Sequence, residues 1–237
     1  MMDGAQAMST IVQALLWYAV LLFSLCIHEA AHATAALLGG DRTGWRSGQV
    51  TLNPLPHIRR EPMGTVWAPL ISFFMMGWMF GWASTPYDRE WSERYPRRSA
   101  LMALAGPLAN GLVMVCAFAL LRWGLLGGLF SAQGPAHFSG DQLVMAIRPE
   151  WEAVGRLLSV MFFLNLILLV FNLIPLPPMD GSSVVMLFLP QTSLQSYRAL
   201  IQRPGMGWLG LIVAWFFFGY LFHPVYIRAI GLLYAQW

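Results

Sequence analysis

The chain has 237 residues, of which 57% are hydrophobic and only 11% are charged, and its formal net charge is +3. Because a soluble domain usually carries about 25% charged residues, this composition excludes an ordinary soluble domain and predicts an integral membrane protein. All fourteen basic residues are arginines, and they are dispersed among short polar segments. This dispersal argues against nucleic-acid binding, which would need basic residues clustered on one face.

Apolar segments long enough to cross a bilayer recur along the chain. About twenty helical residues span the roughly 30 Å of hydrocarbon. We expect spans over about 10–38, 64–83, 99–121 and 153–173. A last apolar region begins at residue 206, and Pro224 is expected to divide it into two helices. The sequence therefore predicts an all-α polytopic membrane protein with five or six transmembrane helices.

The polar connection over residues 41–63 contains a short alternating stretch. Residues 49–52 alternate polar and apolar side chains, and Asn53-Pro54 follows them, so we expect a short strand-like or re-entrant segment here. If all spans alternate in direction, the arginines are nearly balanced between the two faces. The positive-inside rule then predicts no orientation.

The first apolar segment contains His28-Glu29-Ala30-Ala31-His32. Two histidines four residues apart lie on one face of a helix and can bind one zinc ion. Glu29 lies beside them, where it can accept a proton from a water on the metal. A carboxylate within an apolar helix is costly unless it is paired or hydrated, so its position beside two histidines indicates a functional site.

Asp180 is the acidic residue that best fits a third zinc ligand. Apolar segments flank it, and three prolines between positions 175 and 178 unwind the chain before it. Non-helical backbone at membrane depth is tolerated where it lines a cavity. The alternative is that Asp180 only caps the helix that begins at Gly181.

Three further residues are candidates for contacts with the substrate or with its oxyanion: Asn110, Asn172 and His57. The two asparagines lie in or at the end of apolar spans, where an interhelical hydrogen bond is the alternative. His57 lies in the polar connection, where an interfacial or solvated histidine is the alternative.

With these residues assembled, the chain resembles the site-2 protease family of intramembrane zinc metalloproteases. His28 to His32 is similar to the family's first zinc motif, residues 172–181 to its second, and residues 105–110 to its Gly-Pro-Xaa-Xaa-Asn element. Residues 51–57 resemble the compact bacterial subgroup, which has no PDZ or CBS domain. Two stretches depart from that subgroup: Ile58-Arg59-Arg60 follows His57 where an acidic residue is usual, and residues 81–87 lack the usual proline-valine pattern.

The resemblance implies a zinc metalloendopeptidase with one Zn²⁺ per chain, held by His28, His32 and Asp180, with Glu29 as the catalytic base. It implies a multi-pass protein of the bacterial cell membrane. The expected reaction is regulated intramembrane proteolysis, in which the enzyme cleaves a transmembrane or membrane-proximal segment of another membrane protein. That substrate is expected to be a single-pass protein. We expect residues 1–237 to form a single domain, with a catalytic core over about 10–190 and C-terminal helices over about 206–237. The oligomeric state is not predicted.

Two other classes remain open at this point. A metal or proton transporter would be expected to have several intramembrane carboxylates and a repeated half, and the sequence shows neither. Another zinc-dependent membrane hydrolase, such as a prenyl-protein protease, usually takes its third ligand from a helical glutamate, and none is apparent in this sequence.

Overall fold

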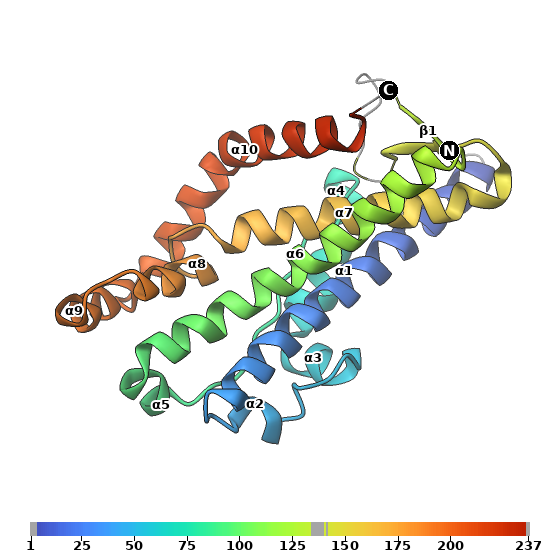
Figure 1. Cartoon of the computed structure of the whole chain (residues 1–237). Coiled ribbons are helices and arrows are strands. Elements are labelled where there is room, and N and C mark those ends of the chain that lie inside the picture. The colour runs from blue at the N-terminus through green and yellow to red at the C-terminus, as the bar shows by residue number, and fades with distance from the viewer. Residues whose placement is uncertain (1–3, 134–139, 141, 236–237) are drawn as a thin grey trace.

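The computed structural model describes residues 4–133, 140 and 142–235, and this part of the chain is almost entirely helical (Figure 1). Within it, four helices are long and apolar enough to cross a membrane. They are α1 (Gly4–Leu38), α6 (Pro96–Leu126), α7 (Glu152–Asn172) and α10 (Met206–Leu233). The expected mostly helical architecture is therefore confirmed, but the described residues contain four such helices where five or six were expected, and a small two-stranded sheet that the sequence did not predict.

Shorter elements connect the four long helices. Between α1 and α6 lie α2 (Thr43–Arg46), α3 (Pro54–Arg60), the π-helical turn η1 (Met63–Trp67), α4 (Ala68–Met76) and α5 (Arg89–Arg94). Between α6 and α7 lie the antiparallel strands β1 (Phe130–Ala132) and β2 (Val144–Ala146), then the 3₁₀ turn η3 (Pro149–Trp151). Between α7 and α10 lie α8 (Asp180–Val184), the 3₁₀ turn η4 (Val185–Leu187) and α9 (Gln191–Ile201).

Helices α1, α6 and α7 lie side by side and form the centre of the molecule (Figure 1). His28 of α1 contacts Asn110 of α6, and His32 contacts Met102, so these two helices run antiparallel. One apolar core joins α6, α7, α10 and the strands, and a second joins α1, α7 and α4. By contrast, large side chains on α10 such as Trp208 and Tyr220 are 74% and 80% exposed, as expected for a helix that contacts lipid.

The predicted span over residues 64–83 is instead a hairpin that returns to the side on which it starts. Its helical part, residues 63–76, is only about 21 Å long at 1.5 Å per residue. Gly77, with φ of 78°, ends α4 in the left-handed conformation that glycine adopts without strain. The returning segment is extended, and its Trp82 amide donates to the Gly64 carbonyl.

The end of this hairpin contacts the end of α1. The Asp88 amide donates to Asp41 Oδ2, and the Trp91 indole donates to the Gly39 carbonyl. The segment following α1 and the segment preceding α6 are therefore at the same end of the molecule.

Two local predictions were wrong. Residues 49–52 form no strand, because Asn53 caps α3 and the Thr51 carbonyl bonds to His57 Nε2, so the backbone turns locally. Pro224 does not divide the last apolar region, since α10 continues through it. Proline is tolerated within transmembrane helices when the surroundings compensate the lost backbone hydrogen bond.

Candidate metal centre

Helix α1 brings His28, Glu29 and His32 into one buried cluster whose ligand atoms all lie within 4.8 Å of one another. The three residues are only 4–7% exposed. The Nε2 atoms of the two histidines are 2.9 Å apart, as the i, i+4 spacing predicts. Since His28 lies ten residues before the end of α1, the cluster is about 15 Å from that end, well within the hydrocarbon depth.

Asp180, the first residue of α8, lies against this cluster. Its Oδ2 atom is 3.2 Å from His28 Nε2 and 3.3 Å from His32 Nε2. This oxygen is buried and has no hydrogen-bond partner among the described residues. Gly181 lets the chain turn closely here, because a Cβ at this position would lie 2.3 Å from the Leu173 carbonyl oxygen. Asp180 makes no capping hydrogen bond on α8, whose N-cap is Met179.

The other nitrogen of each imidazole faces an oxygen. His28 Nδ1 is 2.6 Å from Asn110 Oδ1, and His32 Nδ1 is 2.7 Å from the Met102 carbonyl. Because these oxygens only accept hydrogen bonds, each Nδ1 carries the proton and each Nε2 presents a lone pair.

Three acceptor atoms with no proton between them therefore converge on one point. Tetrahedral zinc with bonds of about 2.0–2.1 Å holds its ligand atoms roughly 3.3 Å apart, close to the spacing of the three atoms in this cluster. Such a convergence of lone pairs and a carboxylate is unfavourable without a cation. The residues present therefore fit a zinc ion.

Gly106 of α6 provides the room for both imidazoles. A Cβ at this position would lie 2.4 Å from His32 Nε2 and 2.6 Å from His28 Nε2. The sequence alone showed Gly106 only as part of a resemblance, because nothing local indicates which side chain it faces. The absence of a side chain at Gly106 lets the backbone of α6 pass directly beside the two Nε2 atoms.

Thr85 is a second residue that sequence reasoning missed. Its hydroxyl lies 2.7 Å from Glu29 Oε2 and 2.9 Å from the Glu29 backbone carbonyl, so it bonds to the carboxylate that would act as the base. Thr85 belongs to the extended half of the hairpin, and no sequence pattern predicts where that half passes.

The remaining candidates are placed differently. Asn110 is fully buried behind His28 and bonds to it. Asn172 ends α7 and donates to the Leu168 carbonyl of its own helix. His57 is 1% exposed and bonds to the Thr51 carbonyl through Nε2, and none of its hydrogen bonds reaches the metal cluster.

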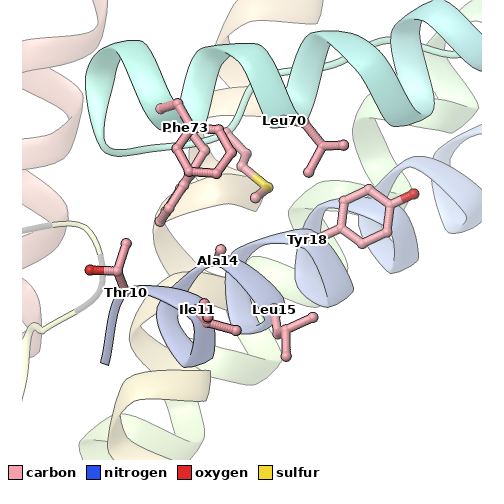
Figure 2. Close-up of a pocket in the computed structure, with 9 residues that line it drawn as sticks. Thr10, Ile11, Ala14, Leu15, Tyr18, Leu70 and Phe73 are labelled. Carbon is pink, nitrogen blue, oxygen red and sulfur yellow. The ribbon is translucent and has the colours of Figure 1, made fainter. Parts of the chain in front are cut away.

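An apolar groove between the first half of α1 and α4 lies apart from this cluster (Figure 2). Its volume is about 230 Å³, and it is lined by residues such as Ile11, Tyr18 and Phe73. Tyr18 precedes His28 by ten residues, or about 15 Å of helix. The groove is therefore separate from the cluster, and its lining contains no residue of the zinc motif.

A buried cluster that fits zinc, with a carboxylate beside it, on a membrane-length helix is the arrangement expected of an integral membrane metallohydrolase. Comparison with known proteins makes this specific, since the sequence model of Peptidase family M50 matches residues 16–212. The chain belongs to this family, which is the site-2 protease family of intramembrane zinc metalloproteases. The predicted family, enzyme class, zinc requirement and membrane location are thereby confirmed.

Relatives of known name agree with this assignment. "Putative zinc metalloprotease YwhC" of Bacillus subtilis strain 168 is 30% identical over 188 residues, which cover 76% of this chain and 75% of the relative. "Putative zinc metalloprotease Rip2" of Mycolicibacterium smegmatis is 29% identical over 192 residues, covering 81% of this chain and 63% of the relative. Rip2 of Mycobacterium tuberculosis strain H37Rv is 30% identical over 204 residues, covering 83% and 68%. No solved structure matches the chain significantly.

Proposed function

We propose that this protein hydrolyses a peptide bond in a transmembrane or membrane-proximal segment of another membrane protein, with a single-pass protein as its substrate. The observation that carries the proposal is the buried Asp180 Oδ2, which has no hydrogen-bond partner among the described residues and faces the Nε2 atoms of His28 and His32. These three side chains would hold the zinc ion. When bound, zinc activates water for attack on a peptide carbonyl and stabilises the charge that develops on the carbonyl oxygen.

Glu29 is the general base in this scheme. It lies next to His28 in the motif, and the Thr85 hydroxyl holds one of its carboxylate oxygens. Glu29 takes a proton from the attacking water and later delivers it to the leaving amine. The Glu29 side chain is only 4% exposed, so this proton transfer takes place away from bulk water.

The roles of the three secondary candidates follow from their contacts. Both ends of the Asn110 amide are already hydrogen-bonded in a fully buried position, so Asn110 acts on His28 and not on the substrate. Asn172 is partly exposed, and its carbonyl oxygen remains a candidate for a substrate contact. His57 shapes the α2–α3 connection through Thr51, which makes a direct oxyanion role the weaker interpretation.

A substrate segment that has unwound from its helix would pair with the extended half of the hairpin. Thr85 places this segment directly beside Glu29. In the described part of the chain, the backbone amides of Ala83, Ser84 and Tyr87 donate no hydrogen bond. An extended segment with free backbone groups can accept an added strand, which would present the substrate carbonyl to the metal.

The membrane topology that goes with this function has four crossings and one re-entrant hairpin over residues 63–88. The hairpin takes the place of the span that the sequence predicts over 64–83. The chain works as a single domain, because α10 packs on both the active-site loop and α6. Gly210 lies so close to Pro177 that a Cβ would meet its carbonyl oxygen, and Arg122 bonds to the Leu233 carbonyl.

The substitution Glu29→Gln tests the proposal. The purified variant should keep its zinc but lose cleavage of a single-pass transmembrane peptide reconstituted with it, because the proton acceptor is gone while the ligands remain. Glu93→Gln, at an exposed position on α5, is the matched control and should retain both zinc and activity. Cleavage by Glu29→Gln at near the wild-type rate would show that the assigned base is wrong.

A further inference from the structure

Three polar side chains occupy the contact between α1, α6 and α7, where the surroundings are apolar. Ser24, Asn110 and Asn165 are each 0% exposed. Ser24 lies four residues before His28, so it occupies the same face of α1 one turn away. Buried amides are costly unless their donors and acceptors are satisfied, so their hydrogen bonds define how these side chains are oriented.

The hydrogen bonds form a chain that ends at His28. Asn165 Nδ2 donates to the Met161 carbonyl at 2.8 Å and to Ser24 Oγ at 2.9 Å. Asn110 Nδ2 donates to Asn165 Oδ1 at 2.8 Å and to the Ser24 carbonyl at 3.2 Å. Asn110 Oδ1 is then left to face His28 Nδ1 at 2.6 Å.

Two backbone carbonyls fix the direction of this chain. The Met161 carbonyl can only accept, so it must face the NH₂ group of Asn165, and Asn165 Oδ1 must then face Asn110. The Ser24 carbonyl likewise requires the NH₂ group of Asn110. Reversing either amide would bring two acceptors together. The oxygen of Asn110 is therefore held toward His28.

We propose that Asn165 and Ser24 are positioning residues for zinc binding, which act by locking the Asn110 amide so that His28 keeps its proton on Nδ1 and offers Nε2 to the metal. This inference rests on the proposed zinc site. The two histidines differ in this respect, because His32 is oriented directly by the Met102 backbone carbonyl and needs no side-chain relay. The orientation of the His28 imidazole depends on side chains from two other helices, so substitution of those side chains can disturb it.

Zinc affinity of the purified protein, measured by competition with a chromophoric chelator, tests the inference. Loss of a partner of a metal-bound histidine typically weakens metal binding about 10–100-fold, and we expect this range for Asn110→Leu. Asn165→Leu should weaken zinc binding in the same direction by up to roughly tenfold. The double variant should bind zinc no more weakly than Asn110→Leu alone, because Asn165 acts only through Asn110.

A pair of serine variants provides the matched control. Ser24→Ala removes an acceptor of Asn165 and should weaken zinc binding. Ser159→Ala removes an equally buried hydroxyl from α7. This hydroxyl bonds to Leu143 and Gly155 but not to the hydrogen-bonded chain of Ser24, Asn165 and Asn110, so its loss should leave zinc affinity unchanged. If Asn165→Leu does not fold, the comparison of Ser24→Ala with Ser159→Ala decides the question.

The outcomes separate this inference from the function it rests on. If the wild-type protein binds no zinc, the proposed site itself is wrong. If the wild type binds zinc and Asn165→Leu and Ser24→Ala bind it equally well, the zinc site stands and the positioning role is overturned. Losses in Asn110→Leu and Asn165→Leu that simply multiply in the double variant would also overturn it, because they would indicate two independent packing effects.

Discussion

At the scale of single residues, the proposed zinc site depends on which nitrogen of each imidazole carries its proton. A backbone carbonyl fixes this for His32, and a side-chain amide fixes it for His28. The resulting lone pairs face Asp180 Oδ2 across 3.2 and 3.3 Å. A buried carboxylate in this position is stable only when a cation or a proton lies between the groups.

The role of Asp180 as a ligand can be separated from a role as a helix cap. Asn caps helices about as well as Asp but lacks the charge that zinc prefers. We therefore predict that Asp180→Asn and Asp180→Ala both lose most of their zinc, as measured by metal analysis of the purified protein, and that both are inactive. Full zinc occupancy in Asp180→Ala would assign the third ligand elsewhere.

At the scale of elements, α6 must approach α1 closely enough for the site to form. We predict that Gly106→Ala abolishes zinc binding, because the added methyl group would lie 2.4 Å from His32 Nε2. Alanine is favoured over glycine by about 1 kcal/mol within a helix, so the loss would occur although the helix itself is better formed.

Gly111→Ala on the same helix is the control for this prediction. The added Cβ would meet Leu169 at an ordinary contact distance of 3.6 Å, so zinc binding should be retained. Zinc content is measured for both variants by metal analysis. Normal zinc content in Gly106→Ala would show that α6 does not limit the space around the two histidines.

The contact between the end of α1 and the start of α5 depends on Asp41. Burial opposes ionisation of this carboxyl, but hydrogen bonds from Thr43 and from the Asp88 amide outweigh burial and hold its pKa below the ordinary value. Because the pKa of Asp41 is lowered in the folded protein, the ionised carboxylate stabilises the folded state fully at pH values above the ordinary pKa. This stabilisation is lost as the pH falls through the lowered pKa.

We therefore predict that Asp41→Asn destabilises the protein by about 1–3 kcal/mol at neutral pH, because one donor of the new amide would face a backbone N–H. Thermal unfolding in detergent measures the difference from wild type. It should stay constant between about pH 5 and 8 and shrink below about pH 4. A difference that grew on acidification would contradict this account of Asp41.

At the scale of the whole molecule, the re-entrant hairpin changes the distribution of positive charge. Because the hairpin returns, the α2–α3 region, α5 and the α9 region share one end of the molecule, and Arg198 of α9 bonds to Ser92 at that end. Ten of the fourteen arginines then lie at this end. They are Arg42, Arg46, Arg59, Arg60, Arg89, Arg94, Arg97, Arg98, Arg198 and Arg203. The other four, Arg122, Arg148, Arg156 and Arg228, are close to the opposite end, which carries the end of α6, the start of α7 and the end of α10.

This asymmetry predicts that the end carrying α2, α3, α5 and α9 faces the cytoplasm. Single cysteines introduced at Ser47, Glu93 and Glu150, in a variant without Cys26 and Cys116, test it with a membrane-impermeant thiol reagent. In intact cells only the Glu150 position should react, and in inside-out vesicles only Ser47 and Glu93 should react. Labelling of Ser47 and Glu93 from opposite sides would contradict the hairpin, and reversal of all three would contradict the orientation.

The sequence by itself determined the parts of this protein that depend on local geometry or on the bilayer. The spacing of His28 and His32 places them together in any helix, and the thickness of the hydrocarbon sets the length of α1, α6, α7 and α10. Asp180 could be singled out because a charge between apolar segments needs a partner. These features need no knowledge of which helices are neighbours.

Only the tertiary structure decided the rest. The composition of an apolar segment such as 63–76 does not distinguish a helix that crosses from one that returns, and the contact between Asp41 and Asp88, 47 residues apart, shows that the chain returns. Asn110 and Thr85 reach the motif from 82 and 56 residues away, so no local pattern assigns them to His28 or Glu29. The physical reason is that helix formation follows local hydrogen bonds and hydrophobicity, whereas the partners of a buried polar group depend on which helices pack together.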